Sequence, residues 1–244
     1  MDGVGRDASE GARAAQASKP FKLWGAGTPR SLRPIWVAEE LGLAYDLAPI
    51  GPRTGETQTP AYTQLTRKQK IPFLEDGDVK LSESIAICRY LTAAYPGPEI
   101  WRAETLRDRA REDEWLCYFY GELDETALYV MRRHLDLAEI YGEAENAVRA
   151  AKGYLAKHLG VIATHLENRA RVMGAPGPQA PGDQLSLPDI VLVSCLDWAV
   201  VYGVAAPEPL LAYRRGLARR PAYRRAMRVN YRDLPGLEQL LGED

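Results

Sequence analysis

The chain has 244 residues, of which 46% are hydrophobic and 26% are charged, and its formal net charge is −2. This composition is ordinary for a globular protein and excludes a fibrous repeat or extensive disorder. The near-neutral balance gives no global reason to expect nucleic acid or an acidic membrane as a partner. Because globular domains usually run to about 100 to 200 residues, the length favours two domains.

Residues 1–19 are rich in Ala, Gly, Ser and charged residues, and they show no periodic apolar face. We expect a flexible extension there, without the apolar stretch of a secretory signal. No window of the sequence approaches the roughly 18 uninterrupted apolar residues of a membrane span. A cytoplasmic protein with no membrane partner is therefore expected.

Strand and helix signals alternate over residues 20–96. Phe21 and Leu23 alternate with Lys22 and Trp24 as in a strand, and a helix is expected to begin near Ser31. A second strand, a polar connection, a hairpin and another helix follow. This order predicts a compact α+β domain over 20–96, closed by a linker at 97–102.

Strand signals are scarce over residues 103–244, where apolar residues recur at three- or four-residue steps. Ser186 and Asp189 precede an apolar run at 190–201, so the two side chains can reciprocally satisfy the first amides of a buried helix. The pattern predicts an all-helical bundle over 103–244.

Cys88, Cys117 and Cys195 lie far apart, each within an apolar helical pattern. We expect three small buried side chains, with no disulfide, no metal site and no nucleophilic role. The arginine-rich segment 214–228 is expected to decorate exposed helix faces, because acidic residues elsewhere balance its charge.

The turn before the first helix is a candidate anion site. Free backbone amides and the positive end of the helix dipole are expected there, and a thiol held beside them ionises more readily. Thr28 is the hydroxyl best placed to donate a hydrogen bond to such a thiolate, and Ser31 is the second choice. A plain turn-and-cap role for both residues is the alternative.

Ile71 and Pro72 open an apolar strand, although proline cannot donate to a sheet ladder. A cis bond there would offer the backbone N–H and C=O of Ile71 to a peptide-like ligand, and an ordinary edge proline is the alternative. Glu83 and Ser84 start the next helix, where they can receive an ammonium and a carboxylate or serve only as a cap.

Three segments, KLWGAGTPRSLRPIWVAEELGLAYDL (22–47), KIPFL (70–74) and LSESIAICRYL (81–91), together resemble the amino-terminal domain of cytosolic glutathione transferases. The resemblance is to bacterial members with a Ser or Thr active site, and it extends over about residues 21–232. It implies a thioredoxin-like domain that binds glutathione, an all-helical domain that holds a second substrate, and a homodimer.

By this resemblance, Thr28 matches the hydroxyl that hydrogen-bonds the glutathione sulfur. Arg30 occupies a position that is Cys or Asn in related classes, so it either assists the thiolate or faces the substrate. The run from Ser31 to Pro34 is similar to one in bacterial glutathione-dependent β-etherases. The implied glutathione-binding residues are Lys70, Ile71, Pro72 as a cis proline, Glu83 and Ser84.

The implied activity is attack by an activated glutathione thiolate on a hydrophobic, aromatic electrophile, with glutathione as co-substrate and no metal. A specialised lyase or β-etherase, a dehalogenase or an isomerase is one alternative. A noncatalytic glutathione-binding scaffold is another. The expected substrate pocket is lined by aromatic side chains of the helical domain, namely Trp115, Tyr118, Phe119, Trp198 and Tyr202.

Overall fold

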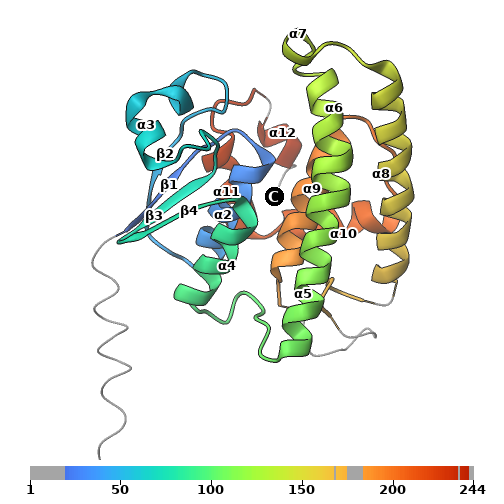
Figure 1. Cartoon of the computed structure of the whole chain (residues 1–244). Helices are drawn as coiled ribbons and strands as arrows, with labels where there is room; N and C mark the ends of the chain where they lie inside the picture. Colours follow the sequence, from blue (N-terminus) through green and yellow to red (C-terminus); the bar gives the residue numbers. More distant parts are fainter. Residues whose placement is uncertain (1–19, 168, 175–183, 236, 242–244) are drawn as a thin grey trace, which may run out of the picture.

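The computed structural model describes residues 20–167, 169–174, 184–235 and 237–241. The extension expected at 1–19 lies outside them. A sheet-containing unit packs beside a helical unit (Figure 1). The first unit consists of β1 (Phe21–Trp24), α2 (Pro29–Glu40), β2 (Tyr45–Ala48), the 3-10 turn η2 (Glu56–Gln58), α3 (Pro60–Leu65), β3 (Phe73–Asp76), β4 (Val79–Ser82) and α4 (Ser84–Ala94).

The four strands lie in the order β2-β1-β3-β4. β1 is parallel to β2 and antiparallel to β3, and β3 forms a hairpin with β4. The parallel pair needs a crossover, which α2 supplies. Trp24 at the end of β1 packs edge-on against Tyr62 of α3, on the face opposite Leu23, because successive side chains of a strand alternate. The predicted thioredoxin-like α+β domain is confirmed.

Helix α2 begins at Pro29, two residues before the start predicted at Ser31. Thr28 is its N-cap, and the Ser31 N–H donates to the Thr28 hydroxyl at 3.0 Å. The Thr28 N–H donates in return to the Ser31 hydroxyl at 3.1 Å. A helix capped by Ser31 would start at Leu32. Because Ser31 is instead the third helical residue of this capping box, the helix starts at Pro29.

Beyond α4, the described residues form helices and connecting loops, with one isolated bridge between Ile100 and Leu185. The predicted helical part is confirmed. The first three helical segments, over residues 106–134, run end to end as one long rod (Figure 1). In chain order the helices are α5 (Leu106–Tyr118), the π-helical η3 (Phe119–Leu128), α6 (Tyr129–His134), α7 (Ala138–Tyr141), α8 (Glu145–Leu166), α9 (Leu187–Val201), α10 (Glu208–Ala218), α11 (Pro221–Asn230) and α12 (Leu237–Leu241).

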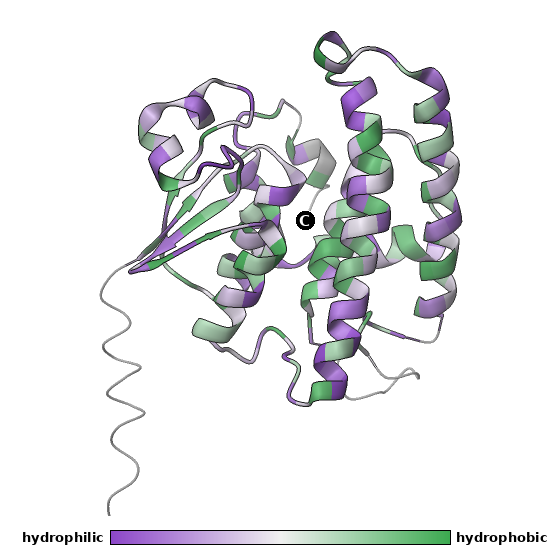
Figure 2. Ribbon diagram, viewed as in Figure 1, coloured by the Kyte–Doolittle hydropathy of each residue, from purple (hydrophilic) through white to green (hydrophobic). Residues whose placement is uncertain are grey.

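Helix α9 is the core of the helical unit, and it contacts α2, α4, α5, η3 and α10. The predicted capping box is present, since the Ser186 N–H and hydroxyl both donate to Asp189 at 2.7 Å. Figure 2 shows apolar residues gathered where the helices face one another, while polar and apolar residues alternate along the outer helix α8. In the described part of the chain, no helix is long and apolar enough to cross a membrane.

Helix α11 returns to the first unit and packs against α2. Tyr223 meets Trp36 edge-on with ring centroids 4.8 Å apart, and Arg220 forms an ion pair with Glu40 at 2.7 Å. Arg225 pairs likewise with Glu39. Two arginines of segment 214–228 thus hold the two units together instead of only decorating the surface.

The three cysteines are free. Burial raises the pKa of the Cys88 and Cys195 thiols to about 12, which keeps both protonated at neutral pH. Cys117 is exposed, contrary to the prediction, because it lies on the solvent side of α5.

Candidate functional site

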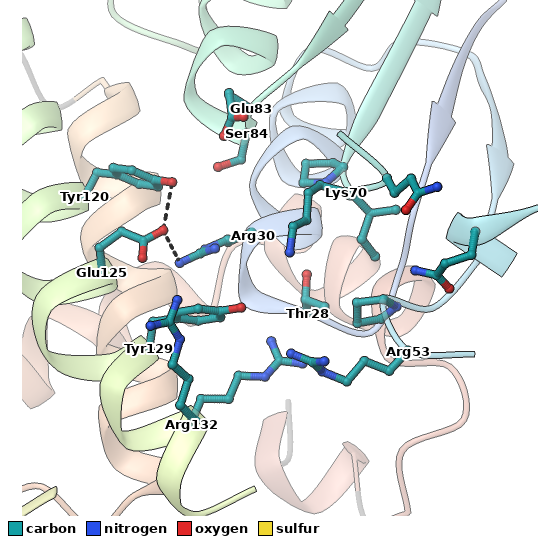
Figure 3. A pocket seen from close by; sticks show the side chains of 16 residues that line it. Thr28, Arg30, Arg53, Lys70, Glu83, Ser84, Tyr120, Glu125, Tyr129 and Arg132 are labelled. Carbon is teal, nitrogen blue, oxygen red and sulfur yellow. Dashed lines mark hydrogen bonds and ion pairs between the residues drawn. The ribbon is translucent and has the colours of Figure 1, made fainter. Parts of the chain in front are cut away.

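A cavity of about 410 Å³ lies between the two units (Figure 3). One wall comes from the β1–α2 turn, the connection that carries Arg53, the segment before β3 and the start of α4. We call this the thioredoxin-side wall. The other wall, the helical wall, comes from η3 and α6.

The β1–α2 turn is held tightly against the segment that carries Ile71. Gly25 has a φ of +108°, and a Cβ on it would stand 2.5 Å from the Cβ of Ile71. Only glycine allows both this backbone conformation and this close approach. The contact brings Thr28 to the cavity next to Ile71, and both residues line it.

The hydrogen bonds around Thr28 leave its hydroxyl proton available to the cavity. The Thr28 oxygen accepts from the Ser31 N–H, and the two hydroxyl oxygens lie 2.8 Å apart. The single proton of the Ser31 hydroxyl has the Asn230 carbonyl oxygen as an acceptor at 2.8 Å. With the Ser31 proton on Asn230, Thr28 is the donor across the contact with Ser31. Its hydroxyl can rotate to give this proton to a thiolate, which is a stronger acceptor, and the bond that it accepts from the Ser31 N–H strengthens it as a donor.

Ser31, in contrast, is fully buried and does not line the cavity. The third residue of a capping box points back toward the cap, so its hydroxyl faces Thr28 and Asn230. Asn230 is the last residue of α11. Its side-chain amide also donates to the Thr28 backbone carbonyl at 3.0 Å, and its backbone carbonyl accepts from the Gly27 N–H at 2.8 Å. We call these bonds from Asn230 to the β1–α2 turn the Asn230 clamp. No local pattern in the sequence predicts it.

Arg30 lines the cavity and is fixed by the helical wall. Its guanidinium donates to Asp124 at 2.5 Å and to Glu125 at 2.9 Å, and it lies 4.5 Å from the Tyr129 ring centroid. Burial alone would lower the pKa of Arg30, but the two carboxylates raise it above its ordinary value. Arg30 is therefore a permanent cation beside Thr28, and Figure 3 shows it between Thr28 and Glu125.

A buried arginine connects the two walls behind the cavity. Arg33 is fully buried, forms an ion pair with Asp124 and donates to the Ser84 hydroxyl at 3.3 Å. The sequence did hold a signal for this pair, because Arg33 stands four residues before Val37 on the buried face of α2. A charge on such a face requires a partner. Asp124, which follows the buried Leu123, is that partner.

The Ile71–Pro72 bond is cis, as expected. Ile71 makes no backbone hydrogen bond with any residue that the structure describes, so its N–H and C=O remain for a ligand. The preceding carbonyl, of Lys70, accepts from the Tyr62 hydroxyl at 2.7 Å, which steadies this segment. Lys70, Ile71 and Pro72 all line the cavity.

Ser84 begins α4, and both it and Glu83 line the cavity. Ser84 is 3% exposed, and its hydroxyl lies with the unpaired first amides of the helix, where negative charge is stabilised. Glu83 has a φ of +74°, and its exposed carboxylate pairs with Lys68 at 2.9 Å.

The aromatic residues expected at the substrate pocket lie elsewhere, and none of the five lines the cavity. Phe119 and Trp198 are buried in the core. The Trp115 ring packs on the His165 ring, with centroids 4.2 Å apart. The Tyr118 hydroxyl is hydrogen-bonded to His158, and the Tyr202 hydroxyl donates to Asp136.

Two other tyrosines line the cavity instead, Tyr120 and Tyr129. Tyr120 is the second residue of the π-helical segment, and Tyr129 follows its last residue. The 3.6-residue periodicity assumed for the sequence does not hold in such a segment. Burial raises the pKa of Tyr120 to about 12, so its phenol stays protonated and donates to Glu125.

Comparisons with known proteins agree with this architecture. Residues 19–93 match the family model "Glutathione S-transferase, N-terminal domain". The chain is 30% identical to glutathione S-transferase 4 of Zea mays over 84% of this chain and 91% of that protein. It is 37% identical to glutathione S-transferase theta-3 of Mus musculus over 35% of this chain. The matches to three mammalian theta-class relatives cover only 36% to 47% of their lengths.

Among solved structures, the theta-class glutathione S-transferase of Xanthomonas axonopodis pv. citri with glutathione bound is 25% identical. It superposes with a TM-score of 0.70 over 85% of this chain and 97% of that one.

Proposed function

This chain belongs to the glutathione S-transferase family, and we propose that it is an enzyme that joins the glutathione sulfur to an electrophilic carbon. The observation that carries the proposal is the Thr28 hydroxyl, which lines the cavity at the start of α2 and can donate a hydrogen bond there. In the reaction the thiol proton is lost first. The thiolate then forms the new C–S bond, and the leaving group departs with its electron pair or the electrons move onto an acceptor group.

Glutathione fits the thioredoxin-side wall as a short extended peptide. Its cysteinyl backbone would pair with the free N–H and C=O of Ile71. Its γ-glutamyl carboxylate would bind Ser84 and the first amides of α4, with Glu83 near the ammonium. Lys70 and Arg53, which line the cavity on the same side, would hold the glycyl carboxylate.

Activation of the thiol follows from its surroundings at Thr28. A hydrogen bond from the hydroxyl and the positive end of the α2 dipole both favour the thiolate over the thiol. The pKa of bound glutathione is therefore lowered. Because the thiolate is the nucleophile, a larger thiolate fraction at neutral pH raises the rate.

The second substrate would lie against the helical wall. Tyr120 and Tyr129 present aromatic surface there, which suits the hydrophobic, aromatic electrophile expected from the sequence. Holding the thiolate and this carbon together in one cavity removes much of the entropic barrier of a bimolecular reaction.

Steady-state conjugation of glutathione to 1-chloro-2,4-dinitrobenzene tests the proposal. Thr28→Ala should lower kcat/KM about 10- to 100-fold, the range expected for losing a hydrogen bond to a charged group. Thr28→Ser should retain most of the activity because it keeps the hydroxyl.

Ser31→Ala is the matched control, since it removes the other half of the same capping box without removing a group that lines the cavity. Its kcat/KM should fall less than that of Thr28→Ala. A larger loss in Ser31→Ala would move the catalytic hydroxyl to Ser31 and contradict the assignment.

A further inference from the structure

The cavity carries more positive than negative side chains. Of its two lining carboxylates, Glu125 is paired with Arg30 and Glu83 with Lys68. No carboxylate among the described residues lies within ion-pair distance of the other basic side chains at the cavity. These are Arg53, Lys70, Arg132 and Arg133.

Glutathione accounts for part of this excess. Its glycyl carboxylate suits Lys70 and Arg53, which belong to the thioredoxin-side wall. Arg132 and Arg133 stand on α6, in the helical wall, and Figure 3 shows the Arg132 and Arg53 side chains reaching toward each other from the two walls. Arg53 and Arg133 both lie over the Tyr141 ring, at 5.4 and 5.6 Å from its centroid. Like charges gathered in one cleft create a positive potential that favours a bound anion. One carboxylate needs no more than Lys70 and Arg53 as partners, so Arg132 and Arg133 are available to a second anionic group.

Arg133 adjoins the aromatic part of the helical wall, and Arg132 precedes it on α6. The Tyr129 ring has the Arg30 guanidinium 4.5 Å from its centroid and the Arg133 guanidinium 4.8 Å from it. Arg133 also lies 5.6 Å from the Tyr141 ring. Stacking holds a planar guanidinium in place, so its outward N–H groups are oriented for a carboxylate. An aromatic ring beside Tyr129 would have these donors at its edge.

We infer that the second substrate is an aromatic electrophile that carries an anionic group such as a carboxylate, which Arg132 and Arg133 bind. The inference rests on the proposed function and narrows the hydrophobic electrophile to a charged one. The anionic group selects the substrate and orients its ring, while the thiolate attacks a different carbon of the same molecule.

Matched glutathione thioethers test this by binding alone, independently of turnover. S-(4-carboxybenzyl)glutathione and S-(4-carbamoylbenzyl)glutathione differ in charge but hardly in shape, and the 3-substituted pair samples a second position. Titration calorimetry should give a Kd about tenfold lower for a carboxylate than for its amide, as expected for a charge-assisted hydrogen bond. Free glutathione is titrated in parallel.

Arg132→Gln, Arg133→Gln and the double variant should bring the ratio of the two Kd values toward one. Arg107→Gln on α5 removes the same charge from an exposed residue that does not line the cavity, and it should keep the ratio. Amide and carboxylate binding equally well to the wild type, in both isomers, would overturn the inference.

Two further outcomes separate the possible errors. If the arginine variants weaken free glutathione as much as the carboxylate conjugate, these residues hold the glycyl carboxylate and the inference fails. If free glutathione does not bind the wild type, the proposed function fails and this inference fails with it.

Discussion

The two walls of the cavity present different kinds of groups. The thioredoxin-side wall offers backbone groups, namely the N–H and C=O of Ile71 and the first amides of α4, with Thr28 and Ser84 beside them. The helical wall offers charged and aromatic side chains on η3 and α6. The first arrangement suits a constant peptide ligand. The second can change its specificity through single substitutions.

The walls also differ in how they are held. The turn at Thr28 is fixed by its own capping box and by the Asn230 clamp. The helical wall depends on Asp124, whose carboxylate binds both Arg30 and Arg33. We therefore expect substitutions behind the two walls to have different costs.

The largest effect should come from Asp124→Asn, which leaves Arg33 buried without a counter-charge. Breaking a buried ion pair in this way typically costs about 3 to 5 kcal/mol of the free energy of unfolding. Urea unfolding measures the loss. As a control, Asp113→Asn removes an exposed partner of Arg89 and should cost less than about 1 kcal/mol. Equal costs would show that the Asp124 network does not support the helical wall.

Asn230→Ala should have the next largest effect, because it leaves the buried Ser31 hydroxyl and Thr28 carbonyl short of partners. We expect a loss of about 1 to 3 kcal/mol in the free energy of unfolding. Asn146→Ala is the control, since Asn146 is exposed on α8 and bonds only Arg149 there. A cost as small as that of the control would mean that α11 does not brace the turn.

Ser84→Ala should weaken glutathione binding with a smaller effect on folding. The hydroxyl lines the cavity at the start of α4, and losing one hydrogen bond to a carboxylate corresponds to about a tenfold higher Kd. Thr164→Ala, which removes an exposed hydroxyl on α8 that does not line the cavity, should leave the Kd unchanged. An unchanged Kd in Ser84→Ala would remove Ser84 from the glutathione site.

The smallest effect is expected for Glu125→Gln. Its carboxylate is 39% exposed and shares Arg30 with Asp124, so solvent screens the pair. The free energy of unfolding should change by less than about 1 kcal/mol. If urea unfolding gives a loss as large as that of Asp124→Asn, the charge that supports this wall has been assigned to the wrong residue.

The fold was largely predictable, because strands and helices impose different apolar periods and the chain follows both. The Ser186 and Asp189 box is an example, since a cap and its helix are neighbours in sequence. The π-helical segment was not predictable from a 3.6-residue period, and the aromatic residues predicted from that period do not line the cavity. Tyr120 and Tyr129 reach the cavity where Tyr118 and Phe119 do not.

The candidate site was predictable only on its backbone side. Thr28, Ile71, Pro72 and Ser84 belong to short motifs whose local geometry decides where they point, and all four line the cavity. Asn230 and Asp124 act through contacts with residues 202 and 94 positions away. The position of Arg33 on a buried helix face indicates that it needs a counter-charge, but which distant residue supplies it depends on tertiary packing.

The central claim is that Thr28 lowers the pKa of the glutathione thiol. A pH titration of thiolate absorbance on the glutathione complex, with wild type and Thr28→Ala, tests it most directly. The account predicts a bound thiol pKa well below that of free glutathione, and a rise of about one unit in the variant, which corresponds to about 1.4 kcal/mol. A bound thiol pKa equal to that of free glutathione, or one that Thr28→Ala leaves unchanged, would contradict it.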